Sequence, residues 1–173
     1  MTKAPDGTTT RAPDVNLKDR SLAGLLAFQA ALLEELRTRG VLRSENNPTG
    51  DLAEYLFCAA YGWKRHPNSE KAVDATGEDG KRYQIKGRRL AGRNPSRQLS
   101  AIRDLDDEGF DVLAAVLFDG VYGIVRAALI PVDVVRRRST YIEHTNSHRF
   151  MLQDNVWDAP QVIDATARLR AIL

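Results

Sequence analysis

The chain has 173 residues, and its 25 Lys and Arg residues against 23 Asp and Glu residues give a net charge of +2. This length suits one domain whose core needs neither disulfides nor a structural metal. The single cysteine excludes an internal disulfide, no apolar stretch reaches membrane-spanning length, and the N-terminus lacks the apolar segment of a signal peptide. We therefore expect a cytoplasmic protein.

The first forty residues predict a tail and then a helix. Residues 1–17 are rich in Thr, Pro and Asp without periodicity, which is typical of a flexible N-terminal tail, and residues 18–173 are expected to form a single domain. Leucines at helical spacing follow and stop at Gly40. They predict an amphipathic helix that belongs to the scaffold.

A second helix is expected after the polar loop that follows. Thr49 or Asp51 would cap its start, and it would run to about Tyr61, where Gly62 ends it. Cys58 lies in its apolar run, so we expect a buried small side chain there rather than a ligand or nucleophile.

A β-hairpin is predicted next. Residues 71–76 and 81–89 resemble strands, and the turn between them contains an Asp-Gly step, a strong hairpin signal. Side chains alternate faces along a strand, so Gln84 and Lys86 would point one way while the residues between them face the core. Asp74, on the first strand, would lie across from Gln84 and Lys86.

The remaining chain predicts a sheet covered by helices. A loop and then a short helix from Gln98 to Leu105 come first, followed by two central strands at 110–120 and 121–131. One or two helical turns at 131–139 and a last strand from His148 to Gln153 follow. The chain then forms a C-terminal helix at 164–173 with Leu169, Ile172 and Leu173 on its inner side. The sum is an α/β sandwich with a mixed central β-sheet flanked by α-helices.

The order helix, strand, hairpin, strand, with Asp74 followed by Gln84-Ile85-Lys86, resembles the PD-(D/E)XK nuclease superfamily in its Gln-x-Lys variant. The resemblance covers about residues 46–130. It implies a restriction-endonuclease-like fold and hydrolysis of phosphodiester bonds, most simply in DNA, by a bacterial enzyme serving restriction, defence or repair.

The same resemblance implies a set of site residues. Asp74 would ligate Mg²⁺ or Mn²⁺ directly, the side-chain oxygen of Gln84 and the main-chain carbonyl of Ile85 would add ligands, and Glu54 on the second helix would bind directly or through water. Lys86 would orient the attacking water or offset negative charge in the transition state. A neutral Gln84 leaves the site one negative charge fewer, so more free metal should be needed.

An acid-free basic stretch flanks these residues. Between Lys81 and Arg103 there are eight basic residues and no acidic one, a concentration that could face a polyanion. The residues predicted to contact nucleic acid are Arg88, Arg89, Arg93, Arg97 and Gln98.

Other readings remain open on the sequence alone. Asp74 could cap a turn while Gln84 and Lys86 face solvent. The protein could be a catalytically silent nucleic-acid-binding module, or a structural subunit for which the basic stretch is incidental. RNA is an alternative substrate to DNA, and a homodimer would supply the two sites needed to cut both strands.

Overall fold

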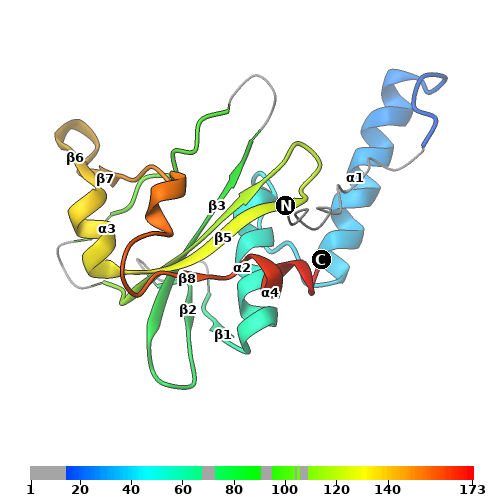
Figure 1. Ribbon diagram of the computed structural model, residues 1–173. Helices are drawn as coiled ribbons and strands as arrows, with labels where there is room; N and C mark the ends of the chain where they lie inside the picture. The colour runs from blue at the N-terminus through cyan, green and yellow to red at the C-terminus, as the bar shows by residue number, and fades with distance from the viewer. Residues whose placement is uncertain (1–14, 68–72, 91–94, 104, 106–108) are drawn as a thin grey trace, which may run out of the picture.

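A mixed six-stranded sheet lies at the centre of the fold (Figure 1). The structure, a computed structural model, describes residues 15–67, 73–90, 95–103, 105 and 109–173. Strand order is β1-β2-β3-β4-β5-β8; β3 and β4 run parallel and the other neighbours antiparallel. The strands are β1 (Lys64–Arg65), β2 (Ala75–Thr76), β3 (Arg82–Arg89), β4 (Val112–Phe118), β5 (Ile124–Pro131) and β8 (Ile163–Asp164). The predicted α/β class with a mixed central sheet is confirmed.

Helices cover both faces of this sheet. The four α-helices are α1 (Leu22–Thr38), α2 (Thr49–Tyr61), α3 (Val132–Arg138) and α4 (Thr166–Arg170); a small hairpin of β6 (Thr140–Ile142) and β7 (Ser147–Arg149) adds to the α3 side. Helices α2 and α4 pack against β3 and β5 and against each other. Among the described residues, no helix is both long and apolar enough to cross a membrane.

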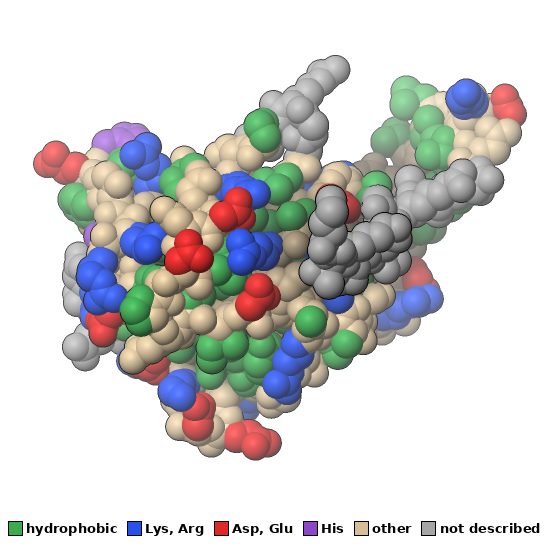
Figure 2. All heavy atoms as spheres, in the orientation of Figure 1, with side chains coloured by type: hydrophobic (Ala, Val, Ile, Leu, Met, Phe, Trp, Pro, Cys, Tyr) green, Lys and Arg blue, Asp and Glu red, His purple; other side chains and the backbone are tan. Residues whose placement is uncertain are grey.

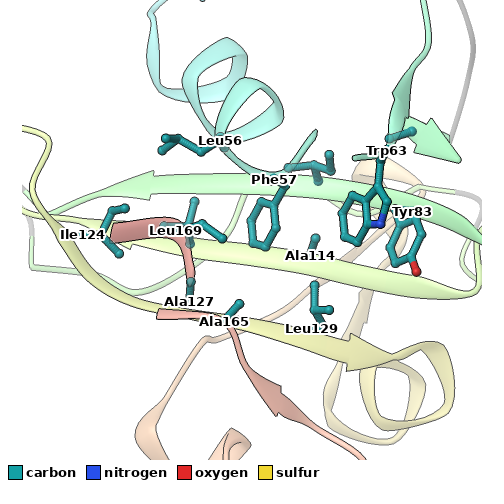
Figure 3. Packing of buried hydrophobic residues seen from close by; sticks show 14 of the residues in the cluster. Leu56, Phe57, Trp63, Tyr83, Ala114, Ile124, Ala127, Leu129, Ala165 and Leu169 are labelled. Atoms are coloured by element: carbon teal, nitrogen blue, oxygen red, sulfur yellow. The ribbon is translucent and has the colours of Figure 1, made fainter. Parts of the chain in front are cut away.

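The core under α2 is a cluster of aromatic and small side chains (Figure 3). Trp63 stacks on Tyr83 with ring centroids 3.6 Å apart, and Phe57 stacks on the other side of Trp63 at 5.9 Å. Ala114 and Ala127 supply the floor of the cluster from β4 and β5. Trp63 is buried in this core, and the small residues let α2 lie close to the sheet.

The opposite face of the sheet is covered by extended chain where a helix was predicted. Leu99 and Ile102 are buried, but their backbones pair with residues 148–151: Leu99 N donates to Phe150 O, and Ile102 and His148 exchange both hydrogen bonds. The predicted helix from Gln98 to Leu105 is therefore wrong. Its apolar spacing suited a helix, but long-range strand pairing satisfies the same backbone groups and buries the same side chains.

Several boundaries also differ from the sequence predictions. Strand β2 holds only two residues of the expected 71–76 run, and β1 was not foreseen. The last strand of the sheet is β8, whereas 147–149 pairs with β6 in the small hairpin. In the C-terminal helix Leu169 is buried as predicted, but Ile172 and Leu173 are exposed because α4 ends before them. Most of the predicted N-terminal tail lies outside the described residues.

Helix α2 approaches β3 most closely at Gly87. A Cβ built there would lie 2.7 Å from Thr49 O and 3.0 Å from the Ala53 Cβ, both on α2. The strand residue facing this helix therefore has to be glycine, and Lys86 and Arg88 on either side of it point to the other face.

We expect Gly87→Ala to lower the free energy of unfolding by about 1–3 kcal/mol, because α2 has to move away from the sheet. Gly50→Ala is the matched control: it lies in α2 with nothing within 4 Å of its added methyl group, and it should stabilise by up to about 1 kcal/mol through helix propensity. Urea unfolding of both variants measures the difference. Equal stabilities would contradict the close packing at Gly87.

Candidate active site

The Asp74 carboxylate accepts a hydrogen bond from β3 just before β2 begins. The Asp74 amide donates to Tyr83 O at 2.8 Å, and the carboxylate Oδ2 accepts from Ile85 N at 2.6 Å. Because β2 contains only residues 75 and 76, the Ile85 amide has no main-chain partner in that strand. Asp74 is thus fixed against the backbone of Gln84 and Ile85, across from the Gln-x-Lys triplet.

Gln84 and Lys86 leave β3 on the same face, away from α2. Gln84 is 5% exposed, and its side-chain oxygen is buried without a hydrogen-bond partner in the described structure. A buried acceptor without a partner costs about 1–3 kcal/mol, so a ligand that used this oxygen would recover that cost. Lys86 is half-buried and has no hydrogen bond or ion pair to any described residue.

Glu54 does not take part in this arrangement as a free carboxylate. Its Oε2 accepts from Arg43 Nη2 at 2.6 Å and from Arg65 Nε at 2.9 Å. Arg65 also pairs with Asp51, whose Oδ2 accepts from the Ser44 hydroxyl and from two main-chain amides. Two arginines therefore neutralise two carboxylates in an ion-pair network that fastens α2 to β1 and the preceding loop.

The Cys58 thiol is affected by charges of this network and by Asp74. Burial raises the pKa of its thiol to about 11; the carboxylates of Glu54 and Asp74 also raise it, while Arg65 and Arg43 lower it. The thiol is half-buried, where a fully buried side chain was expected, and it is protonated at neutral pH.

The residues present fit a weakly charged divalent-metal site rather than a cluster of acids. In the part of the chain that the structure describes, no three His, Cys, Asp or Glu side chains converge where they could hold a metal ion. A cation at Asp74 would rest on one carboxylate, the unpaired Gln84 oxygen and the main-chain oxygen of Ile85. Mg²⁺ tolerates such sites because it keeps several waters and binds substrate phosphates through one or two carboxylates.

The predicted phosphate-contacting residues differ in how far they are already engaged. Arg88 donates to Ser96 O, and Arg89 donates to Gly120 O and stacks over Tyr122. Carbonyl acceptors leave the guanidinium charge uncompensated. Arg97 differs because Asp154 pairs with it at 2.7 Å.

The other two predicted contacts add little to a basic surface. The Gln98 side chain is exposed while its backbone pairs with Met151, and Arg93 lies outside the described residues. Figure 2 shows Lys and Arg interspersed with Asp and Glu on the face it displays. Among the predicted site residues that the structure describes, Lys86, Arg88 and Arg89 on β3 are therefore basic side chains that no carboxylate neutralises, in contrast to Arg97.

Sequence reasoning missed the two arginines that bind Glu54. Arg65 lies on a two-residue strand, and Arg43 lies in a loop whose course depends on the Asp51 carboxylate. Asp51 and Glu54 are three residues apart on α2, and this i, i+3 pair of acids on a helix facing the core was the one signal that basic partners were required.

A scan of the chain against protein-family models finds no match. A comparison with curated proteins finds no relative either.

The ion-pair network predicts acid sensitivity. Burial raises the pKa of Asp51, but hydrogen bonds from Arg43 and Ser44 and the charge of Arg65 outweigh it and hold that pKa below its usual value of 3.8. A carboxyl whose pKa is depressed by folding stabilises the protein above its unfolded pKa, and this stabilisation is lost as pH falls through the folded pKa. Stability should therefore drop below about pH 4.

Asp51→Asn should make the free energy of unfolding less dependent on pH in the acid range. At pH 7 it should lower this free energy by about 1–3 kcal/mol, because Arg65 loses a charged partner. Urea unfolding between about pH 2.5 and pH 7 measures both effects. Asp133→Asn is the control, since Asp133 forms an exposed pair with Arg136 on α3. If the Asp51→Asn and wild-type curves run parallel, Asp51 is not the group that titrates.

Proposed function

We propose that this protein is a Mg²⁺-dependent endonuclease that hydrolyses phosphodiester bonds in DNA and has a restriction-endonuclease-like fold. The observation that carries the proposal is the hydrogen bond from Ile85 N to the Asp74 carboxylate, since Ile85 lies in β3 between Lys86 and Gln84, whose side-chain oxygen has no partner in the described structure. These groups would supply the oxygen ligands of a one-carboxylate metal site and a cation next to its attacking water.

The chain topology supports the same fold assignment. Helix α2 precedes an antiparallel set of three strands, and the chain then crosses over to β4, which is parallel to β3. This is the order that the resemblance implies. The crossover, however, is extended chain where the described residues allow it to be followed, rather than a helix.

A bound divalent cation would neutralise the charge that builds up on the scissile phosphate and lower the pKa of a coordinated water. The chain itself supplies the positioning. Asp74, held by a hydrogen bond from the Ile85 amide of β3, presents a carboxylate, and Gln84 presents a second oxygen from a buried position. Lys86 orients the attacking water and favours its deprotonated form as the water oxygen bonds to phosphorus and the ester oxygen departs.

Substrate binding would rest on the uncompensated cations of β3. Arg88 and Arg89 are each held by a main-chain carbonyl, which restricts the guanidinium group without neutralising it. Restrained cations next to the site lose less conformational freedom when they contact phosphate. Arg88 shares its face of β3 with Lys86, whereas Arg89 points to the other face and stacks over Tyr122.

One observation favours a second candidate, a catalytically silent nucleic-acid-binding module. Glu54, the carboxylate that the resemblance assigns to the metal, is bound by two arginines. If that network is permanent, only Asp74 brings negative charge to the metal. Cleavage and DNA binding, measured separately, distinguish the two functions.

Asp74→Asn and Lys86→Met should each reduce Mg²⁺-dependent nicking of supercoiled plasmid DNA by about 100-fold or more. Asparagine keeps an oxygen acceptor for Ile85 N, and methionine keeps the apolar stem of Lys86, so both variants should fold. Asp79→Asn and Lys81→Met are matched controls, because this exposed pair lies on the same hairpin. Wild-type protein that binds DNA but never cleaves it in Mg²⁺ or Mn²⁺ would favour the silent module.

Gln84→Glu should lower the Mg²⁺ concentration needed for half-maximal cleavage, because a carboxylate adds a charged ligand. In the absence of metal, Gln84→Glu should lower the melting temperature, since a buried carboxylate is poorly solvated. Mg²⁺ should restore the melting temperature by binding this carboxylate. Gln98→Glu, an identical change at an exposed position, is the control. A Gln84→Glu protein whose melting temperature ignores Mg²⁺ would contradict a metal at this oxygen, whatever its activity.

A further inference from the structure

Helix α1 stands away from the rest of the protein (Figure 1) and buries none of its side chains. Within the part of the chain that the structure describes, α1 therefore does not form part of the core as a scaffold helix would. Leu22, Leu26 and Leu32 are 74%, 58% and 51% exposed, and Figure 2 shows hydrophobic side chains on the protruding end of the helix. Helices of this length draw most of their stability from an apolar face packed on another surface.

The leucines of α1 form one continuous stripe. Leu22, Leu25, Leu26, Leu32, Leu33 and Leu36 fall, with Gln29, within roughly 120° of the helix circumference. Charged residues lie off this stripe, where Glu34 and Arg37 pair with each other and Glu35 pairs with Arg39. Exposed apolar stripes rimmed by charge mark interaction surfaces.

The stripe is symmetric about Gln29. Leucines occur three, four and seven residues before Gln29, and again three, four and seven residues after it. Viewed down the helix axis, the leucines also lie at equal angles on either side of Gln29. A twofold axis through Gln29, perpendicular to the helix, therefore sets Leu22 against Leu36, Leu25 against Leu33 and Leu26 against Leu32 of an antiparallel second helix.

The charges obey the same operation. Across this axis Glu34, Glu35 and Arg37 face Gly24, Ala23 and Ser21. No charged residue of α1 meets a like charge. A surface that is complementary to its own twofold copy is what a symmetric homodimer requires, whereas a different partner would impose no such symmetry.

We propose that α1 is a homodimerisation helix that pairs antiparallel with α1 of a second copy of this chain, with Gln29 next to the twofold axis. This inference does not depend on the proposed nuclease function. One helix of 17 residues offers less area than a standard interface, so the expected dissociation constant is on the order of 10 µM.

Sedimentation equilibrium of the full chain between about 1 and 200 µM should show a monomer–dimer equilibrium. Leu26→Glu with Leu32→Glu should abolish the dimer, because the four carboxylates would meet in its centre. Ala27→Glu with Ala31→Glu is the matched control: it adds the same charge to exposed positions on the opposite side of the same helix and should leave the dimer intact. A monomeric wild type, or a dimer that survives the leucine changes, would overturn the proposal.

Disulfide formation tests the helix direction. In a Cys58→Ala background, Gln29→Cys should give a covalent dimer on mild oxidation, since position 29 meets its own copy at the axis. Leu22→Cys should not, because it faces position 36, whereas Leu22→Cys combined with Leu36→Cys should. Ready crosslinking of Leu22→Cys alone would indicate parallel helices and contradict the antiparallel pairing.

Discussion

The candidate site depends on the packing of α2 against β3. Tyr83, Ile85 and Gly87 point toward this helix, and the missing side chain at Gly87 lets the main chains approach. Because side chains alternate along a strand, this contact also decides what faces the other way. Gln84, Lys86 and Arg88 are therefore presented together by the packing that forms the core.

A second constraint is electrostatic. Asp51 and Glu54 are carried by α2 next to the core, where unpaired carboxylates would be costly. Arg43 and Arg65 bind both, and Arg43 also donates to His66 O at 2.7 Å. The His66 amide in turn donates to Asp74 O. The network thus sets the position of the strand segment opposite Asp74, so Glu54 can support the site through its arginines without touching a metal.

Local patterns in the sequence predicted the parts of the fold that local forces determine. The Gly77–Gly80 turn, α2 and the β4–β5 hairpin depend on turn residues and on periodicity within one segment. Segment 98–105 depends instead on pairing with residues about fifty positions later, which its own apolar spacing cannot indicate. The scaffold role expected for α1 has a related explanation. Its leucine pattern predicted an apolar face, but the described residues of this chain do not bury that face.

In the candidate site, too, local sequence predicts some residues and tertiary contacts determine others. Asp74, Gln84 and Lys86 could be placed from the hairpin alone, because register fixes which residues lie opposite each other. The partners of Glu54 could not, since Arg43 and Arg65 reach it through tertiary contacts from a loop and from a two-residue strand.

Burial also gives a physical reason for glutamine at position 84. A carboxylate that is 95% withdrawn from solvent, as the 5% exposure of this side chain implies, would destabilise the metal-free protein. An amide carries the same oxygen with a far smaller desolvation cost. In the proposed enzyme the charge omitted from the protein is supplied by the phosphates of the substrate, so metal and DNA bind more tightly together than either does alone.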